Sequence, residues 1–217
     1  SLADAGIGRV VLVVAPDAET MREYFTRVAP PTRVEVRFVV QGEPLGTADA
    51  VLAARPEVGH APFLVLNADN YYPAEALRAL SALGGSGLVA FDADVLVQES
   101  GIEAERVLRY ALLDIDEANT LRQIVEKPSP DHPLTRRAER WVSMNLWSFT
   151  RQIFDACERV TTSPRGELEL QDAVMIAIER LGVRFAVVRV RSGVLDLSSR
   201  ADIGHVAGKL AAITAQP

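Results

Sequence analysis

Short apolar runs alternate with helical segments along the first half of the chain, and this alternation constrains the fold more than any other feature. Residues 10–14 read Val-Val-Leu-Val-Val, a continuous run that is typical of a strand covered on both faces. A helix is predicted from Pro16 to about Val28, a second strand over 34–40 and a third over 63–66. This βαβαβ pattern predicts an α/β fold with a mostly parallel sheet and helices on both faces.

The second half of the chain predicts antiparallel additions to that sheet. Strands over 106–114 and 120–125 are joined by the polar turn 116–119, as in a hairpin. The other expected elements are helices ending near 55 and over 73–83, 153–159, 168–181 and 199–213, and strands over 88–91, 141–149 and 184–190. We therefore expect one domain over residues 1–217.

Composition limits the classes of function. With 217 residues, of which 48% are hydrophobic, the chain can bury a sizeable core. The net charge of -6 argues against nucleic acid or an anionic membrane as a partner, because both need a basic surface. No apolar run approaches the roughly 20 residues that span a bilayer, and a signal-peptide pattern is missing. The single Cys157, in an amphipathic helix over 152–160, is interpreted as a packing residue in a reducing compartment, so a cytoplasmic location is predicted.

A loop of small and polar residues precedes the third strand. It runs from Gln41 through Pro44, Leu45, Gly46 and Thr47 into a predicted helix. Small residues let backbone N–H groups approach an anion at a helix N-terminus. The loop is therefore a candidate for binding a phosphate and a base.

Two carboxylates follow apolar runs in distant parts of the sequence. The third strand continues into Asn67, Ala68 and Asp69, and Asp196 lies between two leucines. Mg²⁺ usually takes one or two protein carboxylates together with waters and substrate phosphates, so Asp69 and Asp196 are predicted to be a metal pair. The alternative for Asp69 is a structural cap of the turn before Pro73.

Three further polar positions are candidates for substrate contacts. Glu126 and Lys127 end a strand before a proline, where they place either a cation beside a phosphate or a surface ion pair. Asn145 interrupts an apolar strand, so its side chain needs a partner, either a sugar hydroxyl or a main-chain group. Glu167 opens a helix, where an acid also favours the positive end of the dipole.

Other chemistries find little support in the sequence. The three histidines lack metal-ligand spacing, and neither a nucleophile elbow nor a P-loop motif occurs. Asp92 and Asp94 form an acid-x-acid pair that could hold a metal-bound sugar nucleotide, as in glycosyltransferases, and this is the rival enzyme hypothesis. Tyr71 and Tyr72 look exposed and are interpreted as lining either the site or a subunit contact, so a homo-oligomer is left open.

Taken in order, these segments resemble the sugar-1-phosphate nucleotidylyltransferases. The resemblance extends nearly from end to end and rests on Gln41 to Ala48, Phe63 to Asp69, Glu126 to Pro128, Asn145, Gly166 to Glu169 and Val194 to Asp196. It implies a Rossmann-like fold of the nucleotide-diphospho-sugar transferase type. It also implies a nucleotide-binding half over about 1–100 and a sugar-binding half over about 101–217.

The resemblance assigns a role to each candidate. Gln41 and Gly46, with the rest of their loop and residues 67–68, would bind the nucleotide, and Asp69 with Asp196 would hold Mg²⁺. Glu126, Asn145 and Glu167 would bind the sugar, and Lys127 would lie near its phosphate. The implied reaction transfers a nucleotidyl group from a nucleoside triphosphate to a hexose 1-phosphate, giving a nucleotide-sugar and pyrophosphate. UTP or dTTP is the expected nucleotide. Such transfer needs positioning and charge neutralisation more than a nucleophilic side chain.

One part of the family pattern does not occur in the sequence. The family opens with a strand and a glycine-rich loop bearing an arginine and a lysine, which hold the triphosphate. Residues 1–8 instead read as the end of a helix that enters a second strand. Either the numbered chain begins late, which we expect, or the protein is a non-catalytic homologue that binds a nucleotide-sugar as a regulator.

Overall fold

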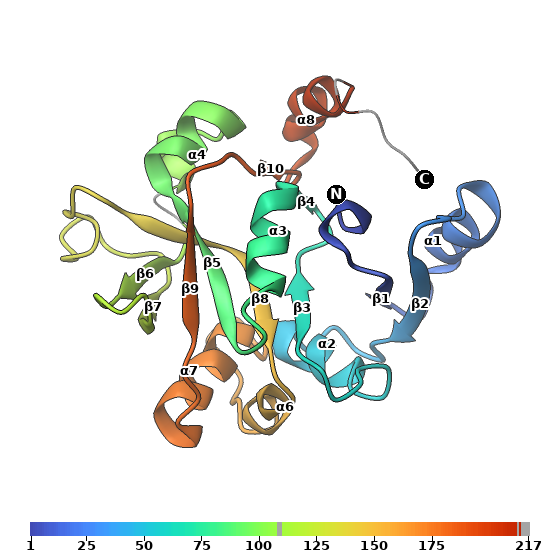
Figure 1. Ribbon diagram of the computed structural model, residues 1–217, viewed down its shortest axis with the longest axis horizontal. Coiled ribbons are helices and arrows are strands. Elements are labelled where there is room, and N and C mark those ends of the chain that lie inside the picture. Colours follow the sequence, from blue (N-terminus) through green and yellow to red (C-terminus); the bar gives the residue numbers. More distant parts are fainter. Residues whose placement is uncertain (108–109, 212, 214–217) are drawn as a thin grey trace. The chain divides into compact units, whose positions relative to one another are not determined.

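The computed structural model describes residues 1–107, 110–211 and 213, and these form two compact units (Figure 1). The larger unit contains the described residues of Leu64–Phe149 and Arg184–Ala215. The smaller unit contains those of Leu2–Phe63 and Thr150–Val183. The chain therefore leaves the smaller unit after Phe63 and returns to it for the segment Thr150–Val183.

A mixed sheet forms the centre of the larger unit. Its strands lie in the order β7-β6-β8-β5-β9, with β3 paired to β8. The bounds are β3 Phe63–Leu66, β5 Gly87–Asp92, β6 Leu112–Ile115, β7 Leu121–Val125, β8 Trp141–Phe149 and β9 Ala186–Val190. Strand β5 pairs with β9 in parallel, whereas β5–β8, β6–β8 and β6–β7 are antiparallel. The antiparallel pairs come from the segments where the hairpin pattern predicted them.

Apolar residues on β5 and β8 build the core of the larger unit. Phe91, Trp147 and Phe149 are each less than 1% exposed, and burying aromatic side chains of this size is a main source of stability. Helix α3 (Ala74–Ser81) packs on β5, β8 and β9. Its buried residues are Ala76, Leu77 and Leu80, a spacing that lines one helix face.

Shorter elements complete the larger unit. They are β4 (Asn70–Tyr71), α4 (Ala93–Ser100), α5 (Ala104–Val107), β10 (Leu195–Asp196), the 3₁₀ turn η3 (Arg200–Asp202) and α8 (Ile203–Leu210). Strands β4 and β10 form a two-stranded antiparallel pair in which Asp196 lies opposite Asn70. This pairing brings two segments together that are far apart in the sequence.

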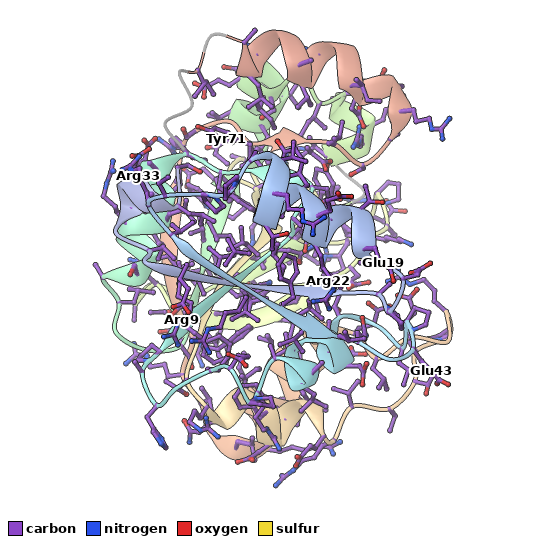
Figure 2. All side chains as sticks on the ribbon, turned by 90° about the vertical axis from the view of Figure 1, so that its right-hand side faces the viewer. Arg9, Glu19, Arg22, Arg33, Glu43 and Tyr71 are labelled. Carbon is purple, nitrogen blue, oxygen red and sulfur yellow. The ribbon has the colours of Figure 1, made fainter. Side chains whose placement is uncertain are left out.

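The smaller unit combines a parallel strand pair with helices. Strand β1 (Arg9–Val14) pairs with β2 (Glu35–Val40) over its whole length. The helical elements are η1 (Ala3–Ala5), α1 (Glu19–Glu23), the π-helical turn η2 (Tyr24–Val28), α2 (Thr47–Ala53), α6 (Gln152–Cys157) and α7 (Leu170–Leu181). Figure 2 shows the strand pair with Arg22, whose guanidinium lies over the ring of Phe38 at 5.0 Å. Helices α2, α6 and α7 pack together, and Cys157 is buried among them, which confirms its packing role.

Three local expectations are corrected by the structure. The predicted strand over 106–114 begins with helix α5 and becomes extended only at Leu112, with residues 108 and 109 outside the described part. Helix α4 was not expected, but Asp92 caps its first turn and Gly101 ends it in the left-handed conformation. Tyr72 is buried rather than exposed, because its ring packs near Phe91.

None of the helices in the described part of the chain combines the length and the apolar character that crossing a bilayer requires.

Candidate functional site

The predicted nucleotide loop lies in the smaller unit and is fixed by its own residues. The side-chain amide of Gln41 donates to the Gly46 carbonyl oxygen at 3.0 Å and to the Asp49 carboxylate at 2.8 Å. The Leu168 N–H donates to the Leu45 carbonyl oxygen at 2.7 Å, and the Ala48 N–H donates to the Leu168 carbonyl oxygen at 2.9 Å. The loop is therefore held in a defined conformation at the start of α2.

Gly46 is the residue on which this conformation depends. Its φ is 123°, a left-handed value that favours glycine. A Cβ atom at this position would lie 2.5 Å from the Leu168 carbonyl oxygen and 2.6 Å from its nitrogen. Both the dihedral angle and the close approach therefore require glycine. Pro44, Leu45 and Thr47 are exposed around it.

The helical segment that touches this loop carries two acids with different surroundings. Glu167, the predicted sugar ligand, is exposed. Glu169 is buried. Its carboxylate forms an ion pair with Arg165 at 3.1 Å and accepts a hydrogen bond from the Ser163 hydroxyl at 3.3 Å. Beside it, the Leu170 N–H donates to the Thr47 hydroxyl at 2.9 Å. The predicted Thr47 and Glu167 thus belong to neighbouring segments of the smaller unit.

The predicted metal pair, Asp69 and Asp196, lies in the larger unit. Asp69 directly precedes β4, the Leu197 N–H donates to its carbonyl oxygen at 3.0 Å, and β10 sets Asp196 opposite Asn70. Although Asp69 lies at the surface, desolvation raises the pKa of its carboxyl, and the negative charge of Asp196 raises it further against a hydrogen bond from its own backbone. The structure therefore brings the two distant carboxylates close together.

Asp196 is the buried member of the pair, and three side chains of the chain donate to it. Arg106 and the hydroxyl of Tyr110 each reach Oδ2 at 2.7 Å, and the Ser198 hydroxyl reaches Oδ1 at 2.6 Å. Burial raises the pKa of Tyr110, and its hydrogen bond to Asp196 raises it further, so the phenol stays protonated and donates.

The oxygen donors here fit a hard divalent cation. No group of three or more His, Cys, Asp or Glu side chains with metal-ligand geometry occurs within residues 1–107, 110–211 and 213. Mg²⁺, however, needs only one or two protein carboxylates when phosphates and waters complete its coordination. Asn70, next to Asp69, has a buried Oδ1 with no hydrogen-bond partner. Two carboxylates and an unpaired amide oxygen match the ligand chemistry of Mg²⁺.

Asn145 lies in a bulge of β8. The pairing of β5 with β8 shifts between Leu88, opposite Trp147, and Ala90, opposite Ser143. Asn145 has a φ of 55°, which lets the strand accommodate the extra residues. The Met144 carbonyl oxygen accepts from the Tyr72 hydroxyl at 2.6 Å and from the Asn70 side-chain amide at 3.3 Å.

Strand register places Glu126 near the same bulge. Leu112 of β6 lies opposite Val125 at the end of β7 and opposite Val142 of β8. Adjacent strands are about 4.8 Å apart, so Glu126 leaves the sheet at the level of Ser143, two strands away. Asp69 and Asp196 on the β4–β10 pair adjoin the bulge at Asn145 in the middle of β8, because Asn70 donates to the Met144 carbonyl oxygen, and Glu126 lies level with Ser143 two strands away.

Lys127 follows Glu126 in an unusual backbone conformation. Its φ is 42°, and the next residue is Pro128. A non-glycine residue rarely adopts a positive φ, and a following proline restricts it further. Backbone strain of this kind concentrates at functional sites. Its exposed side chain is consistent with a role toward a ligand.

The rival acid pair has structural partners. Asp92 accepts from the Asp94 N–H at 3.0 Å and the Val95 N–H at 3.2 Å, and it pairs with Arg191 at 3.2 Å. Asp94 pairs with Arg140. Both carboxylates are thus occupied by a helix cap and surface ion pairs.

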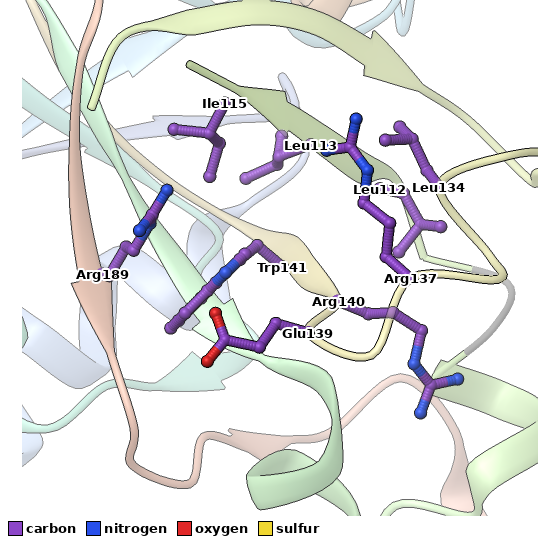
Figure 3. A pocket seen from close by; sticks show the side chains of 9 residues that line it. All are labelled: Leu112, Leu113, Ile115, Leu134, Arg137, Glu139, Arg140, Trp141 and Arg189. Atoms are coloured by element: carbon purple, nitrogen blue, oxygen red, sulfur yellow. The ribbon is translucent and has the colours of Figure 1, made fainter. Parts of the chain in front are cut away.

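A pocket of about 220 Å³ opens at the start of β8, beside Trp141 (Figure 3). Its lining combines apolar side chains, among them Leu112, Leu134 and Trp141, with the charged side chains of Arg137, Glu139, Arg140 and Arg189. None of the predicted site residues lines it.

Sequence reasoning missed the residues that support the predicted ones. Asp49, Asn70, Arg106, Tyr110 and Glu169 each contact or adjoin a predicted site residue. Asn70 follows Asp69 directly, so its position was a usable signal. Arg106 and Tyr110 are positioned by contacts with Asp196, which lies 90 and 86 residues further along the sequence. No local sequence pattern encodes contacts of this kind.

The family model described as "Nucleotidyl transferase" matches residues 1–210. Among curated proteins, the low-salt glycan biosynthesis nucleotidyltransferase Agl11 of Haloferax volcanii is 31% identical over 146 residues, which are 67% of this chain and 37% of that protein. The UTP–glucose-1-phosphate uridylyltransferase AglF of the same organism is 25% identical over 99% of this chain and 82% of its own length.

Other relatives are longer than this chain. The bifunctional protein GlmU of Methanococcus vannielii is 25% identical over 80% of this chain but only 37% of its own length. The chain thus spans less than two fifths of Agl11 and of this GlmU.

Solved structures share the fold. A UDP-glucose pyrophosphorylase complexed with UDP-glucose has a TM-score of 0.74 at 16% identity, covering 96% of this chain and 82% of the other. HddC from Yersinia pseudotuberculosis has a TM-score of 0.66 at 19% identity, with coverage of 96% and 81%. These matches confirm the predicted Rossmann-like α/β fold class.

Proposed function

Because the chain belongs to the nucleotidyl transferase family, we propose that the protein transfers a nucleotidyl group to a hexose 1-phosphate. A phosphate oxygen of the sugar 1-phosphate attacks the α-phosphorus of a nucleoside triphosphate. The new P–O bond forms as the bond from the α-phosphorus to the bridging oxygen breaks, and pyrophosphate leaves with that electron pair. The products are a nucleotide-sugar and pyrophosphate.

UTP and glucose 1-phosphate are the first substrates to test, with dTTP as the second nucleotide. AglF, which aligns with nearly the whole chain, is named a UTP–glucose-1-phosphate uridylyltransferase. The structural neighbour with UDP-glucose has the corresponding product in its site. Both observations support a uridine nucleotide and a glucosyl group.

The observation that carries this proposal is the grouping at the β8 bulge. Asp69 and Asp196 come together through the β4–β10 pair, the Met144 carbonyl oxygen in the β8 bulge accepts from Asn70, and strand register sets Glu126 level with Ser143, two strands from β8. Nucleotidyl transfer needs charge neutralisation and in-line positioning of two anionic substrates. Paired carboxylates beside polar side chains supply groups for both tasks.

The residues then divide the work by their chemistry. Asp69 and Asp196 would hold Mg²⁺, and members of this family usually need a divalent metal. The bound ion would supply charge neutralisation at the phosphates. Lys127 offers a cation to the sugar phosphate, while Glu126 and Asn145 offer hydrogen bonds to sugar hydroxyls. We assign two segments to the nucleotide: the loop from Gln41 to Thr47 in the smaller unit, and Asn67–Ala68 in the larger unit. Glu167 is assigned to the sugar.

Two alternatives are less well supported. The glycosyltransferase hypothesis needs Asp92 and Asp94 as metal ligands, yet both have structural partners. The regulatory-homologue hypothesis requires binding without turnover. The nucleotide-binding and sugar-binding halves and a cytoplasmic location stay predictions.

Pyrophosphate release tests the proposal. The protein is incubated with UTP or dTTP, glucose 1-phosphate and Mg²⁺, and pyrophosphate is measured by a coupled assay. We expect sugar-dependent release that falls on the order of 100-fold or more in Asp69→Asn and Asp196→Asn, since each removes a charged ligand. Asp155→Asn is the matched control, because Asp155 is an exposed acid of α6.

The outcomes separate the hypotheses. Turnover that needs Asp69 and Asp196 but not Asp155 supports the transferase. Binding of UDP-glucose without pyrophosphate release, by a protein that also carries the family's opening strand and glycine-rich loop, would identify a regulatory homologue. Metal-dependent binding of UDP-glucose that is lost in Asp92→Ala but kept in Asp69→Ala would favour the glycosyltransferase.

A further inference from the structure

Arg106 connects the buried candidate metal ligand to a second acid. Its Nη2 donates to Asp196 Oδ2 at 2.7 Å, and its Nη1 donates to Asp202 Oδ1 at 2.8 Å. Asp202 is fixed in turn by the Ser199 N–H at 2.8 Å and the Ser199 hydroxyl at 2.9 Å. The guanidinium is three-quarters buried, with 25% of the side chain exposed, and the Asp196 side chain is 5% exposed. This is a shielded ion pair and not a surface contact.

The local charges explain why Arg106 binds there. The β4–β10 pair sets Asp196 opposite Asn70, the neighbour of Asp69, so two carboxylates lie near each other. Without a metal, Arg106 is the cation that contacts Asp196. A carboxylate offers about four acceptor positions, and Arg106, Tyr110 and Ser198 use three of those on Asp196. A divalent ion that takes Asp196 in a pair with Asp69 therefore meets a carboxylate that already has a cationic partner.

We propose that Arg106 and the divalent cation are alternative partners of Asp196: Arg106 holds the carboxylate when the cation is absent and releases it, while staying bonded to Asp202, when the cation binds. This inference rests on the metal role of Asp69 and Asp196 in the proposed function. Arg106 is then a positioning residue that keeps Asp196 oriented but lowers the affinity for the metal. Asp202 keeps the displaced guanidinium nearby.

Removing the guanidinium should consequently tighten metal binding. Arg106→Gln eliminates both the positive charge and the hydrogen bond to Asp196. Since a hydrogen bond between charged groups contributes enough to change an equilibrium about tenfold, we expect Mn²⁺ to bind on the order of tenfold more tightly. Arg106→Lys keeps the charge, but one ammonium cannot span Asp196 and Asp202 in the way a planar fork can. Its Mn²⁺ affinity should lie between those of the other two proteins.

Mn²⁺ alone is the probe, and free Mn²⁺ is measured by electron paramagnetic resonance during titration of the protein. The matched control is Arg122→Gln, which makes the same charge change in an exposed ion pair with Asp116 on the β6–β7 hairpin. Asp196→Asn reports whether the ion binds at this carboxylate. Circular dichroism establishes that each variant is folded, and the rise in melting temperature with added Mg²⁺ gives a second readout.

Tighter Mn²⁺ binding and a larger Mg²⁺-dependent rise in Tm for Arg106→Gln, with Arg122→Gln unchanged, support the inference. A structural defect would weaken binding, so a gain in affinity is not explained by damage. Equal or weaker binding by Arg106→Gln overturns it, and if that variant does not fold, equal or weaker binding by Arg106→Lys does so. If Asp196→Asn leaves wild-type Mn²⁺ binding intact, the proposed metal pair fails together with the inference. If Asp196→Asn abolishes binding and the arginine variants are unchanged, the inference alone fails.

Discussion

Two residues of the candidate site, Lys127 and Asn145, have a positive φ. Their φ values are 42° and 55°. Asparagine tolerates the left-handed region because its short polar side chain bonds locally, whereas lysine does so poorly. In the proposed function the Lys127 cation binds the sugar phosphate, which would account for a strained residue at this position.

Replacing Lys127 with glycine should therefore separate stability from activity. Glycine adopts a positive φ without strain, so Lys127→Gly is expected to raise the free energy of unfolding by roughly 0.5–1 kcal/mol. Pyrophosphate release should fall at least about 100-fold, because the cation is lost. Urea unfolding measures the first effect. Lys127→Ala is the control: it should lose activity equally and gain no stability, and an equal gain would contradict the strain argument.

At Gly46, in contrast to Lys127, the backbone conformation itself requires glycine. Gly46→Ala would force a Cβ atom to within 2.5 Å of the Leu168 carbonyl oxygen at a φ of 123°. We expect a loss of about 2 kcal/mol or more in the free energy of unfolding, measured by urea denaturation. Gly42→Ala in the same loop is the control, because a Cβ atom there meets nothing within 4 Å. Similar losses in both variants would show that the close approach is unimportant.

At the scale of elements, the bulge of β8 depends on one hydroxyl. Tyr72 is 1% exposed and donates to the Met144 carbonyl oxygen at 2.6 Å. Tyr72→Phe should cost about 1–2 kcal/mol in unfolding free energy, because a buried carbonyl loses its shorter donor. Tyr24→Phe, on a residue that is 50% exposed, should change it by less than about 0.5 kcal/mol. Equal effects in urea unfolding would remove the role assigned to Tyr72.

The elements that sequence reasoning predicted well are those with strong hydrophobic patterns. Strand β8 was expected over 141–149 and occupies those residues, because an apolar run of this length has few alternatives. The segment 106–114 was less predictable. Its first residues form a helix whose Arg106 bonds to Asp196, 90 positions away, and a tertiary contact of this kind overrides local propensity.

The structure brings two of the predicted site residues together, but the residues that contact them were not predicted from the sequence. Asp69 and Asp196 were paired from their apolar surroundings, and the structure brings them together through β4 and β10. Two residues per strand, however, are too few to give a recognisable sequence period. The Gln41 amide, predicted to face a base, also donates to Asp49 and Gly46. Such bonds depend on loop geometry, which alternation of apolar and polar residues does not specify.

At the scale of the whole molecule, the fold is shared with proteins whose sequences have little identity with this chain. A neighbour with 16% identity still has a TM-score of 0.74. Burial in a core requires only apolar side chains of suitable volume, so many sequences meet it. Charged and polar site residues have narrower requirements, since function resides in particular groups placed on a widely shared fold. The tests of function above therefore depend on single carboxylates and amides.

Core packing also determines how the one thiol of the chain behaves. Cys157 lies in α6 and is 2% exposed. Burial raises the pKa of its thiol from 9.0 to about 12, partly offset by the positive charge of Arg55. Only the thiolate reacts readily, so the folded protein should react with a disulfide reagent at pH 8 at least about 100-fold more slowly than the protein in urea. Rapid reaction without denaturant would contradict the buried position.

The same shift predicts how stability depends on pH. The folded pKa exceeds the unfolded value of 9.0, so the contribution of the neutral thiol is fully present below pH 9. Above pH 9 the unfolded state loses its proton first, and stability falls until pH passes about 12. By pH 10 the wild type should lose on the order of 1 kcal/mol more unfolding free energy than Cys157→Ala does. Urea unfolding of both proteins at pH 8 and pH 10 measures this difference, and parallel losses would show that Cys157 titrates normally in the folded state.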